Sequence, residues 1–578
     1  LYNQYKQNNG NYTKFANIIQ SLTSSKFMML NITGGIGNIT VGETAIIGEA
    51  IAREFFNKND YIKGKEMWMA GVASFIAGRG KDTSTTLADA IRKFMNVVDF
   101  DAMNYAPEGS VEAKAFKNFR DFMYSPNSMG EDLMQNGAMF SMMYSNRLIE
   151  VPDAENKGRL KYKAMTLQEY INKCHEEALK NIIQGTDLEA KFTSFLNDIK
   201  HDDNKLKDYI WGRRDFTTEF ANIYLNNAEK RKFIAERKKL RETATTEFES
   251  HKTIMEQLKN GKLAFKEGSI LNQLDKDSIA EGKKVSDALR FMAEFKGKVI
   301  SVNKEIHGNY DKLSAAQIEK NWWGSLVMQY HKHIYPGILK HWRRKGYYNE
   351  ERGFNVIGCG PALYDFLTLP IRKHKAIARM PEAQRETIEA TQNLLKGYVD
   401  LALNARLNFN LMNDNQQAAI LRGMQDACGA LAAILTAIAI RVAWDDDKLK
   451  DSWFANLALY SADSLASQSM MYNPVFLPGE FKKLWSSPIA SLTMPSDILD
   501  ACNIIAEGLM TDDYEWDYTT GRYRGQNKLA VKLTRQIPIY RSYSNLTGLN
   551  QSNSYYKLGD NMLSIINVKG IADAFKGE

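Results

Sequence analysis

Two glycine-containing segments have residue types that bind phosphates in other proteins. Gly34-Gly-Ile-Gly37 begins like the glycine-rich turn of dinucleotide-binding proteins. Thr40 stands where that pattern needs its third glycine, and no clear strand precedes it, so we interpret the segment as a turn between packed helices. Gly80-Lys81 resembles the end of a phosphate-binding loop, but Phe75 and Asp82 replace its first glycine and its hydroxyl residue. Neither segment predicts nucleotide binding.

Carboxylates and imidazoles that could hold a metal ion lie close in sequence at two places. Asp99 and Asp101 have the spacing to converge on one hard cation, but no third carboxylate is near, which favours a helix end. His331, His333 and His341 lie within eleven residues without the spacing of a zinc site. Because no serine or cysteine nucleophile motif occurs either, we predict no metal, no cofactor and no enzymatic activity in this chain.

Basic and aromatic side chains alternate between residues 320 and 379. Eleven lysines and arginines accompany three acidic residues there, so this segment is more positively charged than the whole chain, whose net charge is +7. Such a segment is typical of a surface that binds nucleic acid or an acidic protein. The alternative is a solvated rim around an aromatic core. The candidate binding residues are Trp342, Arg343, Arg344, Lys345, Arg372, Lys373 and Lys375.

An uncharged stretch runs from Ala427 to Ile440. It is shorter than the roughly 20 apolar residues of a membrane-spanning helix, so we expect the buried central helix of a C-terminal domain. The alternative is a segment that enters a membrane only after a conformational change. The residues that would then contact lipid are Leu431, Ile434, Leu435, Ile438 and Ile440.

Composition and periodicity predict an all-α chain. A hydrophobic content of 44% excludes a disordered chain, and only 12 prolines in 578 residues favour long helices. Three regions are expected, 1–155, 156–312 and 313–578, in an arrangement that leaves an elongated shape open. A minor hairpin is expected near 514–525. The four cysteines are too far apart to suggest a disulfide framework, and we expect free, mostly buried thiols.

Apolar spacing and capping residues predict the individual helices. Thr166 and Glu169 have the spacing of a capping box, and so do Ser314 and Gln317. The longest pattern without proline or glycine, 217–257, predicts one helix of about 60 Å. Other predicted helices are 43–56, 67–78, 86–98, 381–408, 416–444 and 453–471.

Two blocks resemble segments of very large virion proteins of crAss-like and related tailed bacteriophages. The first is Leu30-Asn-Ile-Thr-Gly-Gly-Ile-Gly-Asn38, followed by Gly42, Glu49-Ala50, Glu54-Phe55-Phe56 and Asp60-Tyr61. The second is Met328-Gln-Tyr-His-Lys-His-Ile-Tyr-Pro336 with Trp342-Arg-Arg-Lys-Gly-Tyr-Tyr348. Because the sequence begins at Leu1 without the layout of a signal peptide, we expect part of a longer polypeptide.

The resemblance implies an internal cargo protein that is held in the portal and tail and delivered to the host with the genome. Its expected partners are portal and tail proteins and further copies of itself. The resemblance also allows contacts with DNA, and with a membrane only during ejection. The expected location is the virion, then the host cytoplasm or envelope. Related giant proteins include virion RNA polymerases, but Asp99-Phe-Asp101 departs from their aspartate motif, so polymerase activity is not implied. The alternatives are a fixed tail or connector component, or a nucleic-acid-binding accessory protein of a phage transcription or replication complex.

Overall fold

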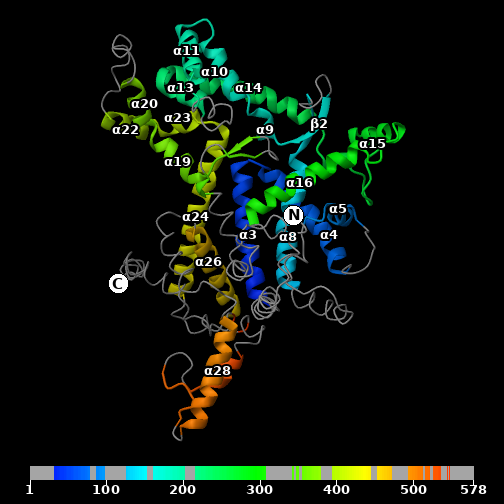
Figure 1. Cartoon of the computed structure of the whole chain (residues 1–578), viewed down its shortest axis with the longest axis vertical. Coiled ribbons are helices and arrows are strands. Elements are labelled where there is room, and N and C mark those ends of the chain that lie inside the picture. The colour runs from blue at the N-terminus through cyan, green and yellow to red at the C-terminus, as the bar shows by residue number, and fades with distance from the viewer. Residues whose placement is uncertain are drawn as a thin grey trace.

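The described part of the chain is almost wholly helical, which confirms the predicted fold class. The computed structural model describes residues 31–77, 86–97, 125–152, 160–201, 203, 215–307, 341–343, 347–349, 354–378, 394–443, 452–471, 493–511, 514–520, 525–534, 543 and 546. Figure 1 shows these helices in an elongated arrangement, with α10, α11 and α13 at one end and α28 at the other.

The largest hydrophobic core is built by the N-terminal helices and by two helices from the middle of the chain. It contains Ile46, Phe56, Phe140, Met143 and Phe295, each at most 1% exposed. Regions 1–155 and 156–312 therefore share this core. The helices are α3 (Ile32–Ala52), α4 (Lys58–Ala77), α5 (Leu87–Met95), α8 (Ser125–Ser145), α15 (Ile270–Ala280) and α16 (Asp287–His307).

Glycines in α3 and α4 permit close contact between helices. Gly34-Gly-Ile-Gly37 lies inside α3, so the predicted turn was wrong. Asn31 is the N-cap of this helix, and its Oδ1 accepts a hydrogen bond from the Gly34 amide at 2.8 Å. A Cβ at Gly42 would overlap the side chain of Met134 on α8. At Gly64 a Cβ would lie 2.6 Å from the backbone nitrogen of Ser141. These glycines set the spacing of α8 against α3 and α4.

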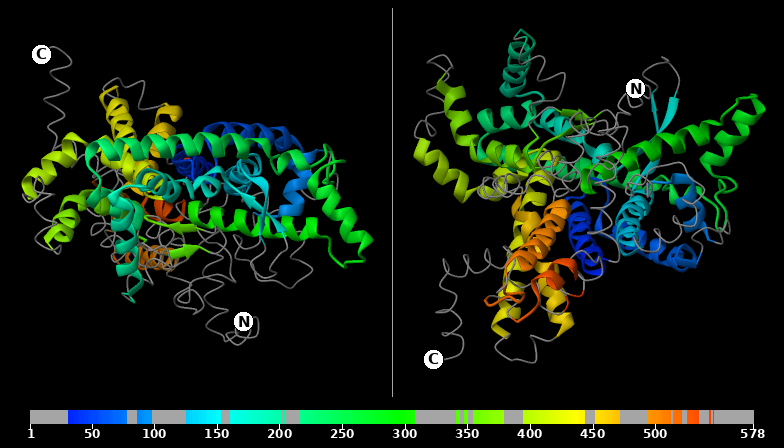
Figure 2. Two further views of the ribbon diagram at one scale, coloured as in Figure 1. Left: turned by 90° about the horizontal axis from the view of Figure 1, so that it is seen from above. Right: turned by 60° about the horizontal axis from the view of Figure 1, so that its bottom comes forward.

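The middle of the chain forms a second helical group, shown from above in Figure 2. Thr166 and Glu169 form the predicted capping box, with both reciprocal hydrogen bonds present. The single helix predicted over 217–257 was wrong, because the chain breaks at Leu225 and Asn226 starts a new capping box with Glu229. The helices are α9 (Leu167–Ile171), α10 (Cys174–Ile183), α11 (Asp187–His201), α13 (Phe216–Tyr224) and α14 (Asn227–Ser250), followed by the 3₁₀ turn η1 (Met255–Gln257).

Two short antiparallel hairpins interrupt the helices. Strand β1 (Arg147–Pro152) pairs with β2 (Leu160–Met165), and β3 (Tyr347–Asn349) pairs with β4 (Phe354–Val356). The sequence analysis predicted neither hairpin. Near the predicted hairpin at 514–525, an antiparallel bridge joins Asp517 and Asn527, and the amide of Tyr518 donates to the carbonyl of Gln526 at 3.0 Å.

Two of the C-terminal helices pack against α3 of the main core. The predicted helix 453–471 is confirmed as α26 (Trp453–Met471), and the predicted helix 416–444 as α24 (Asp414–Ala443). One helix was predicted over 381–408. In the described part of this range the helix breaks at Asn404, so that prediction was wrong. The helices are α19 (Cys359–Leu367), α20 (Leu369–Ala378), α22 (Leu394–Leu403), α23 (Ala405–Leu411), α28 (Thr493–Met510) and α29 (Lys528–Thr534). The predicted capping box at 314–317 lies outside the described residues.

A buried ion-pair cluster ties α24 to α3. Arg422 is 3% exposed, and its Nε lies 2.9 Å from Oε1 of Glu49. Its Nη2 pairs with the carboxylate of Glu54. Because both carboxylates are also buried, removal of the guanidinium would leave charges without compensation. The C-terminal helices are therefore anchored on the N-terminal core.

Candidate functional site

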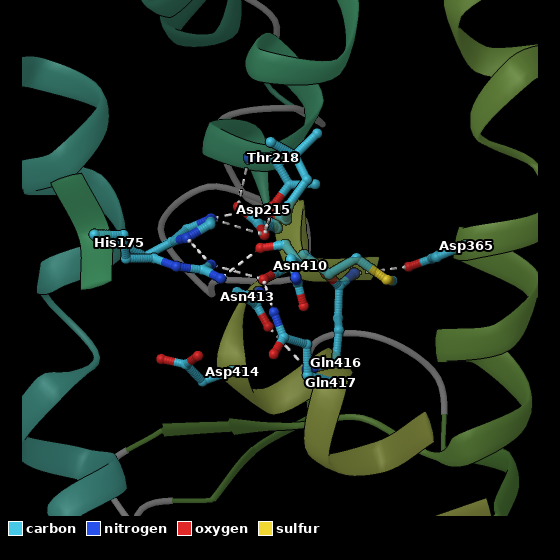
Figure 3. Close-up of polar contacts among 12 residues, drawn as sticks. His175, Asp215, Thr218, Asp365, Asn410, Asn413, Asp414, Gln416 and Gln417 are labelled. Carbon is cyan, nitrogen blue, oxygen red and sulfur yellow. Dashed lines mark hydrogen bonds and ion pairs between the residues drawn. The ribbon is translucent and has the colours of Figure 1, made fainter. Parts of the chain in front are cut away.

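The densest polar network among the described residues lies where α10, α13 and α14 meet the connection between α23 and α24 (Figure 3). His175 on α10 lies at its centre. Its Nε2 is 3.1 Å from Oγ1 of Thr218 and 3.4 Å from Oδ2 of Asp215. Its Nδ1 is 2.8 Å from Nη1 of Arg237. These four side chains come from three helices that share a second hydrophobic core, which includes Phe220.

Arg237 connects this network to the end of α23. Its Nη1 donates a hydrogen bond to the carbonyl of Met412 at 2.8 Å, and its Nη2 donates to the carbonyl of Asn410. The carbonyls in the last turn of a helix have no partner within the helix, and a cation there is also attracted to the negative end of the helix dipole. Arg237 is 3% exposed, so it caps α23 from the interior of the protein.

Asp215 has the corresponding role at the start of α13. Its Oδ1 accepts a hydrogen bond from the backbone amide of Thr218 at 3.0 Å, as expected of an N-cap residue. Burial acts to raise the pKa of this carboxyl, but the neighbouring His175 ring and the hydrogen bonds from Thr218 outweigh burial and hold the pKa at about 2. The carboxylate is therefore ionised at neutral pH.

The network continues along the start of α24. Asn413 caps this helix, since its Oδ1 accepts from the Gln416 amide at 2.9 Å. The side chain of Gln416 donates to Oδ2 of Asp365 on α19 at 3.3 Å. Asp414 forms an ion pair with Arg241 on α14. These residues were not predicted from the sequence. Asn413 carries only the local signal of a helix cap, and the partners of Gln416 and Asp414 lie far away in sequence.

A threonine, a histidine and an aspartate in contact raise the question of nucleophilic catalysis. In a catalytic triad the histidine uses one nitrogen for the carboxylate and the other for the nucleophile. Here Asp215 and Thr218 both contact Nε2 of His175. Because a guanidinium only donates, Nδ1 must accept from Arg237, and neither nitrogen is free to take a proton from Thr218. In this arrangement His175 cannot act as the general base for Thr218, and the contacts order the helices.

The residues weighed and rejected as metal ligands in the sequence form no cluster in the described part of the chain. No group of three or more His, Cys, Asp or Glu side chains with metal-binding geometry occurs there. His341 instead lies with its Nε2 at 3.0 Å from Oδ2 of Asp426 on α24. The other candidates, Asp99, Asp101, His331 and His333, lie outside the described residues.

Acidic partners take up part of the predicted basic surface. Arg343 is paired with Glu305 at 3.6 Å, and Arg372 is paired with Asp365. Lys373 is half-buried, and burial lowers its pKa. Arg344 and Lys345 lie outside the described residues. Among the described candidates, Trp342 and Lys375 are exposed, whereas Arg343, Arg372 and Lys373 are partly buried.

The apolar stretch in α24 is not fully buried. Leu431 and Leu435 are 57% and 56% exposed, so the prediction of a buried central helix was wrong at these positions. The side chains of Ile434, Ile438 and Ile440 lie outside the description. Within the described ranges, no helix has both the length and the apolar character needed to cross a bilayer.

The four cysteines are free, as predicted. Cys174 is buried, but Cys428 and Cys502 are exposed and Cys359 is partly exposed, so the expectation of mostly buried thiols was wrong.

Comparison of the chain with protein-family models, with curated proteins and with solved structures found no match.

Proposed function

We propose that this chain is a non-enzymatic, virion-associated protein of a tailed bacteriophage, an internal cargo protein that is delivered to the host with the genome. The resemblance of residues 30–61 and 328–348 to large phage virion proteins motivates this proposal. The observation that carries it is the exposure of large apolar side chains on α24 and α26, two helices that pack against each other.

These side chains have the pattern of an assembly surface. Met424, Leu431 and Leu435 recur at intervals of seven and four residues, which places them on one face of α24. All three are more than half exposed. At the start of α26, Trp453 and Phe454 are 61% and 67% exposed, with ring centroids 5.9 Å apart. Contiguous apolar patches of more than a few hundred Å² are rare on monomeric proteins and mark interaction sites. We call these five residues the α24–α26 apolar residues.

The polar network supports the non-enzymatic part of the proposal. His175, Thr218 and Arg237 are 6%, 5% and 3% exposed, so no substrate reaches them without opening the helices. Each of these side chains already has a structural partner within the protein. A subunit whose polar groups stabilise helix junctions and whose apolar residues face outward is suited to assembly.

The test is the presence of the chain in purified particles of a phage that encodes it. Particles purified on a density gradient and probed with an antibody against the chain should contain it, and infected cells should receive it when new synthesis is blocked. Detection in lysate alone, with none in particles, would contradict the proposal. The nucleic-acid alternative would then be tested by charge reversal at Arg343, Arg344 and Lys345, which should weaken salt-dependent binding if that alternative holds.

A further inference from the structure

One face of α24 carries apolar residues at the spacing of a helix that packs lengthwise against another helix. They alternate in steps of three and four residues over three heptads: Leu421, Met424, Cys428, Leu431, Leu435, Ile438 and Val442. An average spacing of 3.5 residues keeps such positions on a single seam between two helices. Among them, Met424, Leu431 and Leu435 are 58%, 57% and 56% exposed, and Cys428 is also exposed. We call these seven residues the α24 seam.

The opposite face of α24 packs against the same chain. Arg422 forms its ion pairs with α3, and Oδ2 of Asp426 lies 3.0 Å from Nε2 of His341. A Cβ at Gly429 would lie 3.8 Å from Cγ2 of Thr44 on α3. These three residues of α24 occupy the heptad positions opposite the seam. A helix of a monomeric protein turns its large apolar residues inward, and over these turns α24 does the reverse.

The charge pattern of this face matches a second copy of the same face. The exposed side chains described between positions 424 and 436 carry no charge: Met424, Ala427, Cys428, Leu431, Ala432, Leu435 and Thr436. A two-fold interface brings the same patch of two subunits together, so a patch of one charge would repel itself, whereas an uncharged seam complements itself. The heptad spacing calls for a helix as the partner, and α24 of a second copy is a helix with the matching seam.

A lipid surface fits this helix less well. A helix that lies on a membrane turns a basic polar face to water on the side opposite its apolar face. In α24 that opposite side is occupied by α3, through the ion pairs of Arg422 and the contact of Gly429.

We propose that α24 pairs along its seam with α24 of a second copy of this chain. The pairing covers the exposed side chains of Met424, Leu431 and Leu435 and places the thiol of Cys428 inside the interface. This inference rests on the proposed function, whose assembly role it specifies by naming the partner. Its test needs only the purified chain.

The test measures the alkylation of Cys428 by N-ethylmaleimide in the purified full chain, with the labelled peptides quantified by mass spectrometry. A thiol reacts only where the reagent can reach it, so raising the chain concentration until sedimentation shows a dimer should slow the labelling of Cys428 about tenfold. Cys502, which is exposed on α28, should keep its rate. Leu435→Asp should leave the chain monomeric and remove this protection. The matched control is Thr436→Asp at the next position, which is exposed but outside the seam and should keep both the dimer and the protection.

Each outcome decides the proposal. A dimer that dissociates in Leu435→Asp and persists in Thr436→Asp, with Cys428 protected only in the dimer, supports it. If Leu435→Asp loses helix content by circular dichroism, Leu435→Ala provides the same comparison. A chain that stays monomeric, or equal labelling of Cys428 in the wild type and the seam variant, would overturn it. Protection of Cys428 in a monomeric chain by phospholipid vesicles would also overturn it and assign the seam to lipid.

The result is separable from that of the proposed function. A dimer formed through the seam by a chain that is absent from purified particles would contradict the virion role alone. A monomeric chain that is present in particles would contradict only the pairing of α24.

Discussion

Replacing Arg237 with methionine tests the claim that the polar network around His175 holds the helices together. The substitution keeps most of the aliphatic volume but removes the donors to Nδ1 of His175 and to the carbonyls of Met412 and Asn410. Each buried acceptor left without a donor costs about 1–3 kcal/mol, and three acceptors are affected here. Since such effects are not additive, we expect Arg237→Met to lower the free energy of unfolding by about 3–5 kcal/mol.

The assay is urea unfolding followed by circular dichroism, combined with hydrogen exchange measured by mass spectrometry. The exchange data should show increased opening in α10, α13, α14 and α23, because Arg237 joins these elements. The matched control is Arg231→Met, an exposed position on the same helix, which should change stability by less than about 0.5 kcal/mol. A loss below about 1 kcal/mol for Arg237→Met, or one equal to the control, would refute the reasoning.

Three further predictions concern pH, helix contact and assembly. The folded-state pKa of Asp215 is about 2, below its ordinary value of 3.8. Its stabilising contribution is therefore complete above pH 4 and is lost as the pH falls toward 2. The stability difference between wild type and Asp215→Asn should shrink by about 2 kcal/mol over that range. Gly64→Ala should destabilise by about 1–3 kcal/mol through overpacking, whereas Gly297→Ala, with open space around it, should stabilise α16 by about 1 kcal/mol in urea unfolding. The double substitution Leu431→Asp and Leu435→Asp should lower the oligomer mass measured by sedimentation, with helix content unchanged.

Each of these predictions has a contradicting result. A stability difference at Asp215 that stays constant between pH 5 and pH 2 would show that its carboxylate is not stabilised by its surroundings. Equal effects of alanine at Gly64 and Gly297 would contradict the close contact of α4 with α8. An unchanged oligomer mass in the double variant would exclude the face of α24 that carries Leu431 and Leu435 as an assembly surface.

Local signals in the sequence predicted part of the fold correctly. The capping box of Thr166 and Glu169 is readable because both residues and their backbone partners lie within one helical turn. The break before α14 has the same kind of signal, Asn226 followed by Glu229. The absence of proline and glycine over 217–257 favours one long helix, and this capping pair overrides it.

Other features depend on contacts between distant segments. A glycine is needed at position 42 inside α3 because Met134 on α8 occupies the space that a side chain would take. Nothing near Gly42 in the sequence indicates that neighbour. The network of His175 and Arg237 depends on the carbonyl of Met412, which every residue type carries. A sequence pattern alone therefore could not locate these sites.

The central claim, that this chain is an internal cargo protein of a phage particle, is tested most directly by quantitative mass spectrometry of purified particles before and after triggered DNA ejection. The account predicts that the chain is present in a defined copy number before ejection and leaves the particle with the genome. Copies that remain, in a number that matches the portal or tail symmetry, would contradict the cargo role and indicate a fixed structural component. Complete absence from particles would contradict any virion role.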